Sequence, residues 1–268
     1  MLIDSHCHIN LMVKKKFDIL LTKKEIELAQ PIIDQAKKHN VDIIVNVGTS
    51  LPESKNCISL AQAYPTLYAT AGIHPNDCSE DWKNDFTEIT KLVKEKEHNK
   101  IVAIGEIGID LHYPDSNLSR QTDAFKAQIE LALENDLCIV IHSRDAYDET
   151  LSILEPYQKD IKRGIFHCFS YDQPFARQAV EWGFALGIDG PVTYPKNDIL
   201  RAVVRETPFS SLVLETDSPY LPPQIIRGKP NSPQYIATIA SFIADLKKVS
   251  LEEVSEQTTQ TVRRLFNI

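Results

Sequence analysis

Eight short runs of apolar and β-branched residues recur along the chain, separated by stretches long enough to form helices. Alternation of this kind predicts a parallel sheet whose strands are covered by helices. Eight such units within 268 residues favour an α/β fold of the closed (β/α)8 barrel, or TIM-barrel, type. The predicted strands are residues 1–3, 42–47, 67–71, 101–105, 137–141, 164–166, 184–186 and 212–214.

An open, doubly wound sheet is the alternative architecture. Nucleotide-binding sheets of that type usually carry Gly-x-Gly-x-x-Gly or Gly-x-x-x-x-Gly-Lys-Ser/Thr after the first strand, and neither motif occurs there. No internal repeat, low-complexity segment or Gly/Ser-rich linker divides the chain. Ser250 followed by Glu253 predicts a capping box at the start of a final helix. We therefore expect a single barrel domain over residues 1–268.

The composition is that of an ordinary soluble protein, with 43% hydrophobic and 25% charged residues. No stretch approaches the roughly 18 uninterrupted apolar residues of a membrane span, and no secretory signal is visible at the N-terminus. We expect a cytoplasmic protein. The cysteines are odd in number, widely spaced and free of any Cys-x-x-Cys, so we expect reduced, mostly buried thiols. They are Cys7, Cys57, Cys78, Cys138 and Cys168.

The formal net charge is −8, whereas proteins that wrap duplex nucleic acid usually have a basic balance or a basic face. The cluster formed by Lys14-Lys15-Lys16 and Lys23-Lys24 is interpreted as a solvated loop and helix start. A nucleic-acid substrate would then be held locally. An acidic excess is also compatible with divalent cations, which bring their own positive charge to a phosphate.

Two histidines, His6 and His8, follow the first predicted strand at a spacing of two. Alternate side chains of a strand share a face, so the two imidazoles are expected to point the same way and Cys7 the other way. Histidine is the commonest metal ligand, although a His-x-His also occurs as polar surface. The pair predicts half of a metal site and needs partners elsewhere in the chain.

Those partners are expected at other strand ends, because the C-terminal ends of barrel strands form the site in this fold. Glu106, His142, His167 and Asp217 lie at four such ends, whereas His39, His98 and His112 fall in segments expected at the surface. Each residue taken singly has a structural explanation, such as a core histidine or a helix-cap carboxylate. Together with His6 and His8, they supply six ligand-type residues from five strands.

Four imidazoles and two carboxylates suit two divalent ions with positions left open for water. Glu106 is expected to bridge the ions, since its strand lies between those of the two histidine pairs. Asp217 is expected to complete one ligand shell and to accept a proton from the attacking water, whose pKa a metal lowers toward about 7. Glu106 and Asp217 are thus the predicted catalytic residues of a metal-assisted hydrolysis.

Seven motifs occur in order along nearly the whole chain. They are Ile3-Asp4-Ser5-His6-Cys7-His8, Gly72-Ile73-His74-Pro75, Ile104-Gly105-Glu106-Ile107-Gly108-Ile109-Asp110, Ile141-His142-Ser143-Arg144, Phe166-His167-Cys168-Phe169-Ser170, Leu214-Glu215-Thr216-Asp217-Ser218-Pro219-Tyr220-Leu221, and Arg227-Gly228-Lys229 leading into Asn231. With them the chain resembles the TatD-like deoxyribonucleases of the metal-dependent hydrolase superfamily.

The resemblance implies a (β/α)8 barrel that hydrolyses phosphodiester bonds of DNA, often as a 3′ to 5′ exonuclease. It implies a divalent-metal site built from His6, His8, Glu106, His142, His167 and Asp217. We expect two ions per chain, Mg²⁺ or Mn²⁺ in function with Zn²⁺ as another candidate, because such ligand sets accept several metals. The expected partner is single-stranded DNA or a DNA end, with no membrane and no obligate protein partner.

The chain departs from the family pattern in its last loop, where Pro230 and Ser232 stand in place of the arginine and glutamate that are common in members. Loss of a guanidinium removes a bidentate phosphate contact. Around the site, the resemblance makes His74 a substrate-phosphate or outer residue, and Arg144 is placed to contact a phosphate. Glu215 shares the face of Asp217 and is expected to orient a metal-bound imidazole.

Weaker candidates complete the set. Asp110 and Tyr220 lie in predicted site loops. Four aromatic residues are interpreted as core or rim packing in preference to base stacking. They are Trp82, Trp182, Phe169 and Tyr171.

Two other functions remain open. An amidohydrolase would use the same site on an ester, lactam or aminoacyl bond, but such relatives commonly bridge their metals with a modified lysine where this chain has Glu106. A non-catalytic metal-binding barrel is disfavoured by the complete ligand set.

Overall fold

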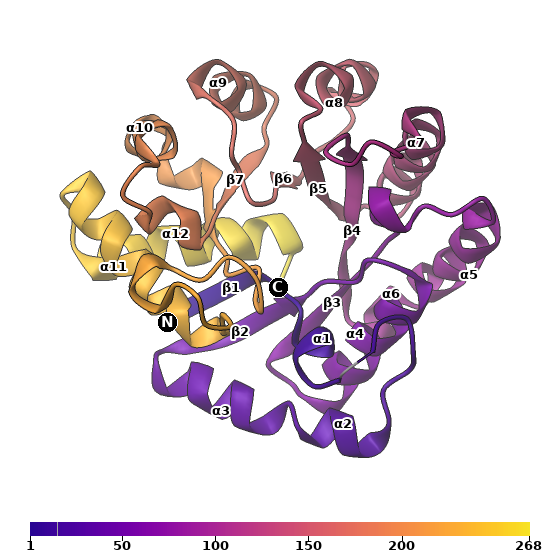
Figure 1. Cartoon of the computed structure of the whole chain (residues 1–268), viewed down its shortest axis with the longest axis horizontal. Coiled ribbons are helices and arrows are strands. Elements are labelled where there is room, and N and C mark those ends of the chain that lie inside the picture. The colour runs from indigo at the N-terminus through magenta and orange to yellow at the C-terminus, as the bar shows by residue number, and fades with distance from the viewer. Residues whose placement is uncertain (15) are drawn as a thin grey trace.

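The chain forms a (β/α)8 barrel, in which eight parallel strands pair in sequence order from β1 to β8 (Figure 1). The computed structural model describes residues 1–14 and 16–268. The strands are β1 (Leu2–Cys7), β2 (Val41–Asn46), β3 (Leu67–Ala71), β4 (Ile101–Asp110), β5 (Cys138–Arg144), β6 (Gly164–Phe166), β7 (Ala185–Ile188) and β8 (Leu212–Leu214). The fold class and all eight predicted strands are therefore confirmed.

Backbone contacts just after β8 bring the last strand against the first. The amide of Asp217 donates to the carbonyl of His6 at 2.9 Å, and the amide of His8 donates to the carbonyl of Ser218 at 2.8 Å. The Asp4 carboxylate accepts a 2.6 Å bond from the Thr216 hydroxyl across the same seam. The edges of the sheet thus meet where two of the predicted ligand segments begin.

Helices surround the barrel on the outside (Figure 1). They are α1 (Ile9–Met12), α2 (Lys23–Glu27), α3 (Gln30–Lys38), α4 (Leu51–Ala63), α5 (Trp82–Lys94), α6 (Lys96–Asn99), α7 (Leu118–Glu134), α8 (Tyr147–Leu154), α9 (Gln173–Glu181), α10 (Asp198–Glu206), α11 (Ile236–Lys247) and α12 (Leu251–Phe266). Short 3-10 turns include η1 (Pro75–Asp77), η3 (Gly190–Thr193) and η5 (Gln224–Ile226). None of the helices in the described ranges is both long and apolar enough to cross a membrane.

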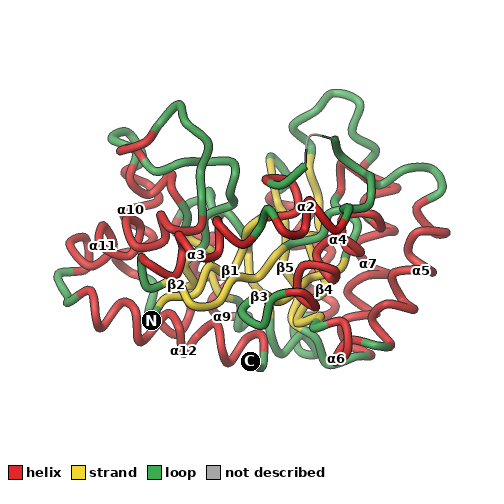
Figure 2. The backbone as a smooth tube through the Cα atoms, turned by 90° about the horizontal axis from the view of Figure 1, so that it is seen from below, coloured by secondary structure: helices red, strands yellow, loops and turns green. Residues whose placement is uncertain are grey.

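Helix α12 lies across the N-terminal end of the barrel, at the end opposite the longest loops (Figure 2). Its Val262, Leu265 and Phe266 join an inner cluster with strand residues such as Ile3 and Val213. The helix begins at Ser250, whose hydroxyl accepts the Glu253 amide at 3.0 Å and so forms the first half of the predicted capping box. The inner core is therefore sealed below, and polar side chains occupy the other end.

Four strands end later than the apolar pattern indicated: β1 reaches Cys7 and β7 reaches Ile188, and the extensions of β4 and β5 line the site. The predicted strand 101–105 continues to Asp110, and the predicted strand 137–141 continues to Arg144. The two pair on both sides of a register shift between Ile104 and Ile107, and beyond it Gly108 lies opposite His142 and Asp110 opposite Arg144. The ladder shifts in register around Glu106 and then resumes, so the strands continue although polar residues end the apolar run.

The prediction of a solvated lysine cluster is wrong for Lys14, which is 9% exposed. Its ammonium group donates to Glu53 Oε2 at 2.6 Å and to the Ile19 carbonyl at 3.2 Å. Glu53 belongs to α4 and also accepts bonds from Asn10 and from the amide of Asp18. A buried carboxylate thus draws the lysine inward. Lys15 lies outside the described residues, and Lys16 is exposed.

The cysteines match the prediction of reduced, mostly buried thiols. All five are free, four are buried and Cys168 is half-buried. Burial raises the pKa of the Cys138 thiol to about 12.

A candidate metal centre at the C-terminal end of the barrel

The six residues predicted as metal ligands come together at the C-terminal end of the barrel. His6 lies on β1 with His8 just beyond it, Glu106 on β4 and His142 on β5. His167 follows β6 and Asp217 follows β8. His6 and His8 face the same point, as predicted, with their Nε2 atoms 3.2 Å apart, whereas Cys7 joins the outer apolar cluster.

Glu106 is the centre of the group. Its Oε2 lies 3.4 Å from His6 Nε2. Its Oε1 lies 2.8 Å from His142 Nδ1 and 3.4 Å from His167 Nε2. The two carboxylate oxygens thus face two different sets of imidazoles, which is the arrangement that a bridging ligand requires.

Asp217 stands on the β1 side of this centre. Its Oδ1 lies 3.3 Å from His8 Nε2 and 3.7 Å from His6 Nε2. Two groups of ligand atoms within 4.8 Å of one another share Glu106, one with His6 and His8 and the other with His142 and His167. Nitrogen and carboxylate donors at this spacing suit a divalent transition metal, so the donor set fits the predicted ions.

Hydrogen bonds on the far side of the rings fix which nitrogen faces the centre. His8 Nδ1 donates to the Val47 carbonyl at 3.0 Å, which leaves the Nε2 lone pair of the neutral ring free for an ion. His167 Nδ1 lies 3.1 Å from Glu215 Oε1. Such outer partners orient imidazole ligands and raise their basicity.

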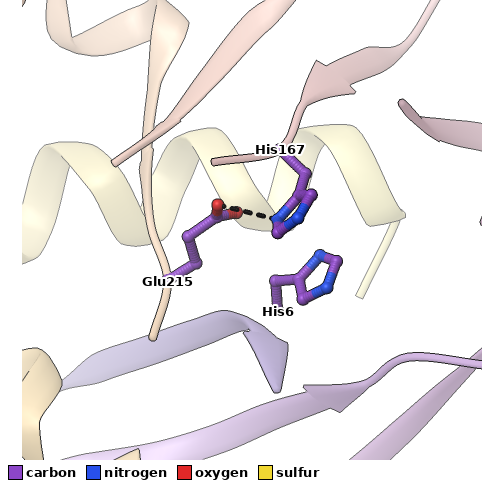
Figure 3. A group of neighbouring side chains, drawn as sticks. All are labelled: His6, His167 and Glu215. Atoms are coloured by element: carbon purple, nitrogen blue, oxygen red, sulfur yellow. Dashed lines mark hydrogen bonds and ion pairs between the residues drawn. The ribbon is translucent and has the colours of Figure 1, made fainter. Parts of the chain in front are cut away.

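Glu215 lies beneath His167 and is fully buried (Figure 3). Its Oε1 also accepts the Cys168 amide at 2.5 Å, and the ring of His167 stacks on that of His6 with centroids 3.7 Å apart. A Cβ added to Gly187 on β7 would lie 2.3 Å from Glu215 Oε2. Only glycine at that position leaves room for the carboxylate. The contact has the geometry of the predicted orienting role.

Asp110 makes the corresponding contact with His142, and sequence reasoning ranked it too low. Its Oδ2 lies 3.0 Å from His142 Nε2 and accepts a 2.9 Å bond from Asn76. The signal for this contact was the spacing of four residues from Glu106, which becomes informative only once β4 is known to extend to Asp110. Asp110, His142 and His74 also form a further group with ligand atoms within 4.8 Å.

His74 is placed as a hydrogen-bond donor to the site. Its Nδ1 accepts the Asn76 amide at 3.1 Å, so in the neutral ring the proton is on Nε2. That nitrogen lies 3.5 Å from Glu106 Oε1. An N–H directed at the centre suits a substrate oxygen better than a metal ion.

The electric charges of the site balance one another. Burial raises the pKa of Glu106, but His167, His74 and the other imidazoles outweigh it and hold that pKa well below its usual range. Burial likewise opposes the ionisation of Asp217, yet its pKa is lowered because His8, His167 and His6 surround it. Both carboxylates are ionised at neutral pH, which a metal ligand requires.

The pKa values of the histidines shift in different directions. Burial lowers the pKa of His167, but Glu106 and Glu215 outweigh it and raise the pKa to about 10. The pKa of His6 is lowered by burial and by His167. His6 Nδ1 has no hydrogen-bond partner among the described residues.

One buried acid at a strand end went unnoticed in the sequence. Asp189 follows β7, is 1% exposed, and neither of its carboxylate oxygens has a hydrogen-bond partner within the described part of the chain. Burial and the nearby Glu215 raise its pKa well above the usual range. Its position after an apolar strand was the available signal.

The remaining candidates lie around the centre. Arg144 is exposed at the end of β5, and the Tyr220 ring lies edge-on to His8 with centroids 6.3 Å apart. The preference for packing over base stacking holds for Trp82 and Phe169, which are buried in the core. Trp182 and Tyr171 are half-buried and pack against the same cluster.

Comparison with known proteins places the chain among relatives with the same overall extent. The sequence profile described as TatD related DNase matches residues 3–267. The chain belongs to the TatD family. An uncharacterized metal-dependent hydrolase, YabD of Bacillus subtilis, is 36% identical over 268 residues and is covered completely, as is this chain.

Two further relatives come from Escherichia coli K12. The uncharacterized metal-dependent hydrolase YcfH is 31% identical over 267 residues, which cover 100% of this chain and 96% of YcfH. The crystal structure of the TatD homolog YJJV superposes with a TM-score of 0.89 at 27% identity, covering 100% of this chain and 98% of that one. The barrel is thus the fold of the TatD family.

Proposed function

We propose that this TatD-family chain is a divalent-metal-dependent hydrolase of DNA phosphodiester bonds, which removes nucleotides from the 3′ end of a single strand. The observation that carries the proposal is Glu106, whose two oxygens face separate imidazoles in a buried centre. The family description and the names of the curated relatives support hydrolysis with a metal.

We assign His6, His8 and Asp217 to one ion, His142 and His167 to a second, and Glu106 to both. Bound divalent ions would lower the pKa of an attacking water and neutralise charge on the phosphoryl group. Asp217 is ionised at neutral pH, so its carboxylate can accept the proton that the water loses. The Nε2–H of His74 is placed to donate to a phosphate oxygen.

The outer residues keep this arrangement in place. Glu215 and Asp110 hold the rings of His167 and His142 in the orientation that directs a nitrogen at Glu106. We assign both as positioning residues. Their loss should weaken metal affinity by about 10- to 100-fold, as is typical of outer partners of metal ligands.

End-labelled single-stranded DNA tests the proposal directly. We expect cleavage with Mn²⁺ or Mg²⁺ and none in excess chelator. His142→Ala and Asp217→Ala should lower the rate by more than the roughly 100-fold cost of losing an outer partner. His98→Ala removes an exposed histidine on α6 and should leave the rate unchanged.

Persistent cleavage in chelator would refute the metal requirement. Comparing 5′-labelled with 3′-labelled strands distinguishes the proposed polarity from its reverse. A parallel panel of ester, lactam and aminoacyl substrates separates the proposed reaction from that of an amidohydrolase.

A further inference from the structure

Hydrogen bonds join the loops after β7 and β8 beside the candidate metal centre. The Tyr194 hydroxyl donates to the Pro222 carbonyl at 2.9 Å, and the Thr193 hydroxyl accepts the Gln224 amide at 2.8 Å. Pro222 lies two residues beyond Tyr220, which contacts His8. In Figure 1 these orange loops lie on the side of α10 and α11.

Between them the loops line an open pocket of about 510 Å³. Its lining residues are Tyr194, Pro195, Lys196, Asn197, Gln224 and Arg227. The Arg227 guanidinium stacks on the Tyr194 ring, with its central carbon 4.3 Å from the ring centroid. Stacking fixes the plane of the guanidinium and leaves its N–H groups free to bind an anion.

Within the described residues, the two cations of this pocket have no acidic partner. Arg227 and Lys196 are exposed, and neither belongs to an ion pair formed among residues 1–14 and 16–268. Arg201 nearby differs, since it is paired with Asp198 at 2.8 Å. The pocket therefore has a net positive charge in a chain whose net charge is −8.

The opposite side of the candidate metal centre is lined by acidic residues. A cavity of about 580 Å³ lies between the segment that contains η1 and the segment between β4 and α7, and Asp77 and Asp115 line it. Its one arginine, Arg120, already donates to the Cys78 carbonyl at 3.2 Å and pairs with Glu80 at 3.5 Å. A polyanion that reaches the metal centre is repelled on this side and attracted on the other.

We propose that the loops after β7 and β8 bind the phosphodiester backbone of the substrate strand beyond the scissile bond, with Arg227 and Lys196 each contacting a phosphate. The proposal rests on the proposed function, because it takes the metal centre as the place of cleavage. The planar guanidinium suits a bidentate contact with phosphate oxygens. Pro230 and Ser232 replace the arginine and glutamate that are common in family members, but Arg227 still supplies a guanidinium in the same loop.

The test compares a long substrate with one that has no flanking phosphates. The substrates are a labelled 20-nucleotide single strand and bis(p-nitrophenyl) phosphate, both with Mn²⁺. Each phosphate contact to a single strand contributes about 0.7 to the slope of log affinity against log salt concentration. Loss of one contact therefore lowers the affinity about fivefold at 0.1 M salt, relative to 1 M salt. Arg227→Gln should therefore lower kcat/KM for the 20-mer about fivefold, and Arg227→Gln with Lys196→Gln about 25-fold.

Hydrolysis of bis(p-nitrophenyl) phosphate should stay unchanged in both variants. Arg205→Gln is the matched control, because Arg205 is exposed near the C-terminal end of α10, at the other end of the barrel. Arg227→Lys keeps the charge and should keep the salt slope of the wild type. Equal losses on both substrates, or an unchanged 20-mer, would overturn the proposal.

Binding measured without metal separates this inference from the proposed function. Fluorescence anisotropy of the labelled 20-mer in EDTA should show weaker binding and a smaller salt slope for Arg227→Gln than for wild type. If neither substrate is cleaved with any metal, the proposed function fails, and the anisotropy difference still decides whether this surface binds a single strand. Equal anisotropy curves for the two proteins would refute the proposal that these loops bind the strand.

Discussion

Gly187→Ala should weaken metal binding from a position that touches no predicted ligand. The added Cβ would lie 2.3 Å from Glu215 Oε2, 2.5 Å from its Cδ and 2.6 Å from its Oε1. Ordinary van der Waals contact begins near 3.4 Å. The whole carboxylate must therefore move by about 1 Å, because all three clashes are with the same group.

That movement breaks the contacts by which Glu215 holds His167 and the Cys168 amide, at 3.1 and 2.5 Å. Loss of an outer partner typically weakens metal affinity by about 10- to 100-fold, or about 1.4–2.7 kcal/mol. Overpacking of a buried site adds about 1–3 kcal/mol of lost stability. We expect a folded protein with a lower melting temperature and a Kd for Mn²⁺ raised by that factor.

Calorimetric titration of metal-free protein with Mn²⁺ measures the affinity, and thermal unfolding measures the stability. Gly183→Ala is the matched control, since its φ of 87° costs about 1–2 kcal/mol of strain while its Cβ meets no atom within 4 Å. This control should lose stability and keep its metal affinity.

A double-mutant cycle completes the test. In a Glu215→Ala background the clash is absent, so Gly187→Ala should no longer change metal affinity. Wild-type affinity in the folded Gly187→Ala single variant would refute the role given to Glu215.

Three further predictions concern the scaffold. Lys14→Met should lower the free energy of unfolding by about 3–5 kcal/mol in urea at pH 7, because it leaves the buried Glu53 carboxylate without its cation; a loss below about 1 kcal/mol would contradict this account. Burial raises the pKa of Glu53, but bonds from Lys14, Asn10 and Asn56 outweigh burial and lower that pKa in the folded protein. Ionised Glu53 therefore stabilises the fold at pH values above the pKa of the unfolded chain, which is about 4.3. That stabilisation is lost as the pH falls through the folded pKa, and the penalty of Lys14→Met should shrink in the same pH range. Because the pKa of Cys138 is about 12, its thiol should resist a disulfide reagent at pH 8 in the native protein and react after unfolding in guanidinium; rapid labelling of the native thiol would show the site to be open. Ser250→Ala removes the cap of α12 and should cost about 1 kcal/mol in thermal unfolding, whereas Ser250→Asp should behave as wild type; equal stability of all three proteins would show that the cap is dispensable.

Most of the fold was predictable because strands that are buried on both faces appear in the sequence as short apolar runs. The pattern failed at the ends of β4 and β5, where Glu106, Asp110 and His142 replace apolar residues while the backbone pairing resumes beyond a register shift. Apolar periodicity indicates which side chains are buried among other apolar groups. It does not indicate a strand where polar side chains line the barrel axis. The functional segment of a strand is therefore the part that the pattern predicts least well.

The convergence of the candidate ligands was predictable for a topological reason, since the ends of all barrel strands meet at one end of the barrel. Contacts between outer residues were not, because they depend on atomic detail. The Asp110 contact with His142 requires the extension of β4. The burial of Lys14 requires Glu53, which lies 39 positions away on another element. Neither pairing has a signature in local sequence.

The position of α12 has a consequence for how this chain is made. The inner core contains Ile3 from the first strand, and it is sealed by Val262, Leu265 and Phe266 near the end of the sequence. The carbonyl of Met1 accepts a 3.2 Å bond from the Thr259 hydroxyl, across 258 positions. During synthesis, the first strands therefore wait with their inward apolar face uncovered until the final helix leaves the ribosome. Such late closure leaves apolar strand surface exposed in the growing chain, which is the condition under which partly folded chains aggregate.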